Sequence, residues 1–121
     1  MTHKRALLVE DDADHLYIFS HVVQKAGYAV DLAANMRQAE AMLAGGHHYD
    51  LFICDMRLPD GRGFDLLREQ HARLQAAGTV IVVISAEDHY RQACEALGIE
   101  YFLVKPVLPS MFAEFLKRIN R

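Results

Sequence analysis

Five short apolar segments alternate with five segments of helical periodicity, and this alternation most constrains the fold. The apolar segments are rich in Val, Ile, Leu and aromatic residues and span 5–9, 28–33, 50–54, 79–84 and 100–104. Short, continuously apolar runs of this kind are typical of strands buried on both faces of a parallel sheet. The segments between and after them, 13–26, 35–45, 63–76, 87–97 and 109–120, carry apolar residues at helical spacing. The sequence therefore predicts an α/β protein with a doubly wound, five-stranded parallel sheet.

Glycines and a polar pair mark where the helical segments begin and end. Asn35 and Gln38 have the spacing of a capping box. A glycine follows each of four helical segments, where a left-handed residue ends a helix favourably; these are Gly27, Gly45, Gly78 and Gly98. No linker or repeat interrupts the pattern, so residues 1–121 are expected to form a single domain.

Composition excludes several classes of function. The net charge of −3 offers no basic excess for phosphate neutralisation, which argues against nucleic-acid binding by this chain. No apolar run approaches the roughly 18–20 residues that span a membrane, and the N-terminal apolar segment is too short for a secretory signal. Cys54 and Cys94 both lie in apolar or helical patterns and are expected to be buried thiols. These observations predict a cytoplasmic protein.

The seven histidines show no metal-ligand spacing and are interpreted as surface residues.

Chemically active residues follow four of the five predicted strands. Glu10 and Asp11 follow the first, and Asp55, Ser85 and Lys105 follow the third, fourth and fifth. In a doubly wound sheet such positions meet at one edge. Clustered carboxylates repel one another unless they recruit a cation, and hard carboxylate oxygens favour Mg²⁺. An aspartate beside Mg²⁺, a lysine and a hydroxyl predicts phosphoryl transfer to that aspartate.

Each of these residues also has an ordinary structural interpretation. The acidic run that ends in Asp12 could be a solvated turn that caps the first helix, and Ser85 alone is more often a cap. Lys105 alone is usually a surface charge. It is their coincidence at predicted strand ends that favours a site.

The chain resembles the response-regulator receiver domains of two-component signalling. The resemblance covers the whole chain and is carried by LLVEDD (7–12), FICDMRLPDGRGFDLL (52–67), VVISAED (82–88) and YFLVKP (101–106). It implies a flavodoxin-like fold with strand order 2-1-3-4-5. It also implies a Mg²⁺-dependent phosphoacceptor that catalyses its own phosphorylation and slow dephosphorylation, rather than an enzyme with a separate substrate.

The resemblance implies a role for each matching residue. Asp55 would accept the phosphoryl group, while Ser85 and Lys105 would contact it. The metal would be held by Glu10, Asp11, Asp55 and the backbone carbonyl of Arg57. Phe102 would be the aromatic that moves with Ser85 on activation. Pro106 would follow a cis peptide bond.

The chain departs from its relatives in ways that raise a hypothesis. Val107 replaces a common aromatic, Phe102 lacks a tyrosine hydroxyl, and the interval from Ser85 to Lys105 is short, which predicts a trimmed helix or loop between them. Arg57 and Glu87 each stand two residues after a site residue, and in the family these positions flank the path of the attacking water. We expect the two charges to pair and to slow hydrolysis of the acyl phosphate; the alternative is two solvated side chains.

The resemblance also implies partners. A sensor histidine kinase or phosphotransfer domain would dock on an apolar strip, for which the candidates are His15, Ile18, Val22, Pro106 and Val107. The output face would comprise segments 90–95, 101–103 and 111–118, with Tyr90 and Met111 as exposed anchors. This face would bind a downstream effector or mediate a phosphorylation-dependent dimer, with no nucleic-acid or membrane contact by this domain.

Two other functions fit the residues less well. A phosphatase of the haloacid dehalogenase type also uses an aspartate, Mg²⁺ and a lysine, but it needs a second acid where this chain has Arg57. A flavodoxin-like cofactor binder needs a phosphate loop of Gly, Ser and Thr where this chain has the acidic residues 10–12.

Overall fold

A five-stranded parallel sheet organises the computed structural model, which describes residues 4–120. The sheet order is β2-β1-β3-β6-β7, and every pairing is parallel. Counted along the chain among these five strands, this is the predicted order 2-1-3-4-5, so the predicted doubly wound fold is confirmed. The strands are β1 (Lys4–Val9), β2 (Tyr28–Ala33), β3 (Leu51–Asp55), β6 (Val80–Ser85) and β7 (Tyr101–Val104).

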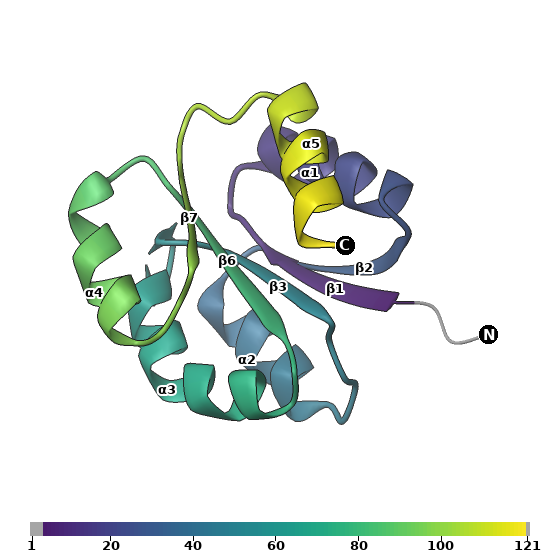
Figure 1. The fold of residues 1–121 in the computed structure, drawn as a ribbon. Coiled ribbons are helices and arrows are strands. Elements are labelled where there is room, and N and C mark those ends of the chain that lie inside the picture. The colour runs from purple at the N-terminus through teal and green to yellow at the C-terminus, as the bar shows by residue number, and fades with distance from the viewer. Residues whose placement is uncertain (1–3, 121) are drawn as a thin grey trace.

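Helices cover both faces of the sheet (Figure 1). On one face lie α1 (Ala13–Lys25) and α5 (Pro109–Ile119). The two helices contact each other where the Phe19 ring of α1 packs edge-on against the Phe112 ring of α5. The other face is covered by α2 (Met36–Ala44), α3 (Gly63–Ala76) and α4 (Arg91–Ala96). Each face has its own buried apolar cluster. Because β3 is buried at every residue, the sheet centre is shielded from water on both sides.

The helix ends differ from the prediction in detail. Gly27, Gly78 and Gly98 have positive φ as expected, but Gly45 has φ −78° and Gly46, with φ +85°, takes the left-handed conformation in its place. The prediction for Gly45 was therefore wrong by one residue. Two adjacent glycines can adopt either arrangement, so the sequence alone does not decide between them.

The segment after β6 is trimmed, as the short interval from Ser85 to Lys105 predicts, although the helical periodicity predicted one longer helix. A 3₁₀ turn, η1 (Asp88–Tyr90), precedes an α4 of only six residues, so the single helix expected over 87–97 is trimmed.

A small hairpin after β3 was not predicted. It consists of β4 (Arg57–Leu58) and β5 (Gly61–Arg62), which pair antiparallel just beyond Asp55. Its base is closed by the Gly63 amide, which donates to the Met56 carbonyl at 2.8 Å. A Cβ on Gly63 would lie 2.0 Å from the Asp55 carbonyl oxygen. Glycine is therefore required where the chain turns back beneath the end of β3.

Two further predictions concern burial and membranes. Cys54 and Cys94 are both buried free thiols, as expected. Burial raises the pKa of the Cys94 thiol to about 11 and that of Cys54 still further. Among residues 4–120, no helix combines the length and apolarity needed to cross a bilayer.

Candidate functional site

The carboxyl ends of β1, β3, β6 and β7 meet at one edge of the sheet and bring the predicted site residues together. Glu10 and Asp11 follow β1, Asp55 ends β3, Ser85 ends β6 and Lys105 follows β7. They line a single hollow of about 270 Å³. Residues separated by up to 95 positions in the sequence thus form one pocket, as expected for the crevice of a doubly wound sheet.

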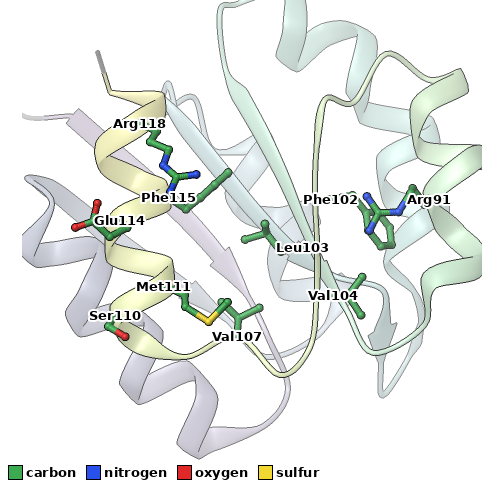
Figure 2. Close-up of a pocket in the computed structure, with 10 residues that line it drawn as sticks. All are labelled: Arg91, Phe102, Leu103, Val104, Val107, Ser110, Met111, Glu114, Phe115 and Arg118. Atoms are coloured by element: carbon green, nitrogen blue, oxygen red, sulfur yellow. The ribbon is translucent and has the colours of Figure 1, made fainter.

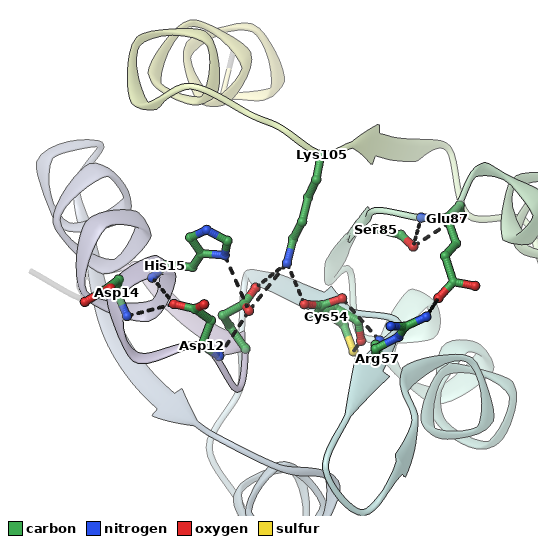
Figure 3. Close-up of polar contacts among 10 residues, drawn as sticks. Asp12, Asp14, His15, Cys54, Arg57, Ser85, Glu87 and Lys105 are labelled. Atoms are coloured by element: carbon green, nitrogen blue, oxygen red, sulfur yellow. Dashed lines mark hydrogen bonds and ion pairs between the residues drawn. The ribbon is translucent and has the colours of Figure 1, made fainter.

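Lys105 places a positive charge beside the acidic residues of this pocket. Its Nζ lies 2.7 Å from Asp55 Oδ2 and 3.1 Å from Glu10 Oε2, and Figure 3 shows its side chain extended across the edge of the sheet. Burial alone would lower the pKa of Lys105, but its contacts with Asp55 and Glu10 outweigh that effect and raise it. The lysine is therefore charged and holds the Asp55 carboxylate in place.

Three carboxylates converge beside this lysine. Ligand atoms of Glu10, Asp11 and Asp55 all lie within 4.8 Å of one another. Glu10 and Asp55 are buried, whereas Asp11 is exposed to solvent. Burial and the neighbouring Asp55 charge raise the pKa of Glu10. A hard divalent cation would relieve this repulsion, and an all-oxygen donor set open to water on one side suits Mg²⁺.

Asp12 caps a helix, unlike its acidic neighbours Glu10 and Asp11. Its Oδ1 accepts from the amides of Asp14 and His15 at 2.9 and 3.1 Å and so caps α1. The capping interpretation of the acidic run therefore holds for Asp12 only, because Glu10 is buried in the pocket.

The Ser85 hydroxyl is engaged away from the acidic residues. Its Oγ accepts from the Glu87 amide at 2.9 Å and donates to the Glu87 carbonyl at 3.2 Å. The Glu87 carboxylate in turn pairs with Arg57, with 2.5 Å between Nη2 and Oε1, and contacts His89. The Arg57 amide donates to Asp55 Oδ1 at 3.2 Å. The ion pair of Arg57 and Glu87, which both line the pocket, thus joins β4 to the segment that follows β6 (Figure 3).

His15 lies closer to the pocket than its interpretation as a surface residue suggested. Its ring is partly exposed, but its Nδ1 is buried, lacks a hydrogen-bond partner among the described residues and lies 3.8 Å from Glu10 Oε1. The signal was available in the sequence, because the first turn of a helix that follows β1 must face the strand end.

The residues predicted to contact a kinase fall in two adjoining hollows. His15, Ile18, Pro106 and Val107 line one beside Lys105. Val22 lines the next, which shares Ile18. The peptide bond between Lys105 and Pro106 is cis.

The predicted output face contains a hollow between β7 and α5, lined in part by α4 (Figure 2). Met111 is 56% exposed there, but Tyr90 is half-buried and stacks on Phe64, so only Met111 is an exposed anchor. Phe102 is buried, and the Arg91 guanidinium covers its ring at 4.9 Å from the centroid. Nothing in the sequence pattern indicated this cation–π contact.

Comparisons with known proteins agree on one family. A family model described as "Response regulator receiver domain" matches residues 6–117. The alginate biosynthesis transcriptional regulatory protein AlgB of Pseudomonas aeruginosa is 35% identical over 87% of this chain, and the sensory/regulatory protein RpfC of Xanthomonas campestris is 31% identical over 93%. This chain spans only 23% and 16% of those relatives. The chemotaxis response regulator CheY4 of Vibrio cholerae superposes with a TM-score of 0.84 at 31% identity, covering 98% of this chain and 99% of that one.

Proposed function

Because this chain belongs to the response regulator receiver domain family, we propose that it is a phosphoacceptor switch whose acceptor is Asp55. The donor is a sensor histidine kinase or a phosphotransfer protein. The observation that carries the proposal is the Lys105 ion pair with Asp55 inside a pocket that also gathers Glu10 and Asp11. This arrangement supplies a nucleophilic carboxylate with positive charge fixed beside it.

Each side chain has a defined task in the transfer. An Asp55 oxygen attacks the phosphorus, the bond from phosphorus to the donor breaks, and the donor leaves with that electron pair. Glu10, Asp11, Asp55 and the Arg57 carbonyl would hold Mg²⁺, which supplies positive charge to the phosphoryl oxygens when bound. Lys105, already beside Asp55, is placed to pair with a phosphoryl oxygen once Asp55 carries the group.

Ser85 connects the pocket to the output face. Its hydroxyl must give up the bond that it donates to the Glu87 carbonyl before it can donate to a phosphoryl oxygen. That movement would carry the segment after β6, and Phe102 on the neighbouring β7 would adjust with it. Phosphorylation thereby shifts a two-state equilibrium at the face formed by α4, β7 and α5. The partner there is an effector or a second copy of this chain.

The remaining assignments follow from the same proposal. Residues 1–121 act as one receiver domain with Mg²⁺ as its cofactor. Two buried thiols favour a reducing compartment, so we place the protein in the cytoplasm. His15, Ile18, Val22, Pro106 and Val107 form the docking strip for the kinase.

Intact mass after incubation with acetyl phosphate and Mg²⁺ tests the proposal. We expect one phosphoryl adduct that requires Mg²⁺, is absent in Asp55→Asn and decays slowly. Steady phosphate release from many phosphomonoesters without a lasting adduct would instead indicate a phosphatase. The absence of any adduct from either acetyl phosphate or a phosphorylated kinase would contradict the proposal.

A further inference from the structure

The tip of the hairpin formed by β4 and β5 is bonded to the start of α2. Asp60 Oδ1 accepts from the Met36 amide at 2.8 Å, and Asp60 Oδ2 accepts from the Arg37 amide at 3.0 Å. The side chain of Asn35, the N-cap residue of α2, accepts only from the Gln38 amide, at 2.8 Å. Two of the amides that a helix leaves unpaired at its start are therefore satisfied by a residue more than twenty positions away.

An apolar contact reinforces this polar one. A Cβ on Gly61 would lie 2.4 Å from the Met36 sulfur, so the Met36 side chain packs directly against the hairpin backbone. The carboxylate also lies at the positive end of the α2 dipole. Its hydrogen bonds with Met36 and Arg37 lower the pKa of Asp60, so the anion is present near neutral pH.

The hairpin needs such an anchor. Each of its strands has two residues, and an isolated two-stranded hairpin is marginal in water. Arg57 stands in its first strand, paired with Arg62, and its amide donates to the Asp55 carboxylate. The orientation of the Arg57 carbonyl is therefore coupled to the position of the hairpin as a whole.

We propose that Asp60 is a positioning residue: by bonding the hairpin tip to α2, it fixes the backbone that presents the Arg57 carbonyl to the metal. This inference rests on the proposed function, because it takes that carbonyl as a ligand. Asp60 itself lies outside the pocket, in an exposed turn, and would act on the metal only through the backbone of the hairpin.

The test compares two variants that remove different caps from the same helix. Asp60→Ala breaks the bonds between the hairpin and α2, whereas Asn35→Ala removes a cap of α2 without touching the hairpin. Mg²⁺ is titrated into the unaltered chain and into each full-length variant. Binding is followed by the NMR chemical shifts of the backbone amides of residues 55–63. The free energy of unfolding of each variant is measured in urea without metal.

We expect Asp60→Ala to weaken Mg²⁺ binding by about tenfold, the lower end of the loss seen when an outer-shell partner of a ligand is removed. Asn35→Ala should bind Mg²⁺ with the affinity of the unaltered chain, even if it lowers the free energy of unfolding as much as Asp60→Ala does. Asp60→Asn keeps one acceptor oxygen and should restore part of the affinity.

Equal Mg²⁺ affinity in Asp60→Ala and the unaltered chain, or an equal loss in Asn35→Ala, would overturn the inference and leave the proposed function intact. If the unaltered chain took up no Mg²⁺, the proposed metal site itself would fail. The two failures are therefore distinguishable.

Discussion

At the scale of single residues, the ion pair between Arg57 and Glu87 joins two side chains that line the pocket. Arg57 is 81% exposed and Glu87 is 30% exposed, and exposed pairs contribute less than about 1 kcal/mol to stability. Its expected effect is therefore on access to the pocket. We predict that replacing both residues with alanine shortens the lifetime of phosphorylated Asp55 several-fold, because water then reaches the acyl phosphate more freely.

The decay of the intact-mass adduct after removal of phosphodonor checks this prediction. Replacing Lys117 and Glu114, an exposed pair on α5 that does not line the pocket, provides the control. An unchanged lifetime in the Arg57 and Glu87 variant would show that the pair does not shield the phosphoryl group.

At the scale of elements, α1 carries the surface predicted to receive the kinase. Ile18 is 41% exposed and lines both hollows of the proposed docking strip. Its replacement by arginine should reduce phosphotransfer from a kinase that phosphorylates the unaltered chain, because a charge would then enter an apolar contact. Phosphorylation by acetyl phosphate should not change, because Ile18 does not line the acidic pocket.

Leu32 offers a matched control for this measurement. It is 40% exposed but lies on β2 and lines neither hollow of the docking strip. Leu32→Arg should leave transfer from the kinase at its original rate. Equal losses in the two variants would show that an added charge, rather than the strip, is responsible.

The elements also show which parts of the structure the sequence could predict. The strands are continuous apolar runs, and their predicted bounds lie within one residue of those observed, as with 50–54 against Leu51–Asp55. The pocket residues were found because they follow those runs directly. The hairpin after Asp55 was missed because its strands are two residues long and mostly polar. The bond from Asp60 to α2 joins distant segments, and no local pattern encodes it.

At the scale of the whole molecule, the pocket lies at the carboxyl ends of the strands, and the proposed output face is formed by α4, the edge strand β7 and α5. Ser85 ends β6 inside the pocket, and in the strand register it lies beside Val104, which lines the hollow on the output face. A movement of Ser85 can therefore reach that hollow through one strand pairing. The core on either side of the sheet need not rearrange, so two states of the face can differ by little energy.

We predict that this face mediates a dimer when Asp55 is phosphorylated. Analytical ultracentrifugation should show a larger dimer fraction with acetyl phosphate and Mg²⁺ than without them. Met111→Glu should abolish the increase while the adduct still forms, because a charge at this exposed side chain would be buried in the contact. Leu108→Glu is the matched control, since Leu108 is 57% exposed but does not line the hollow. A phosphorylated chain that stays monomeric at every concentration would contradict the prediction and leave an effector of different sequence as the partner of this face.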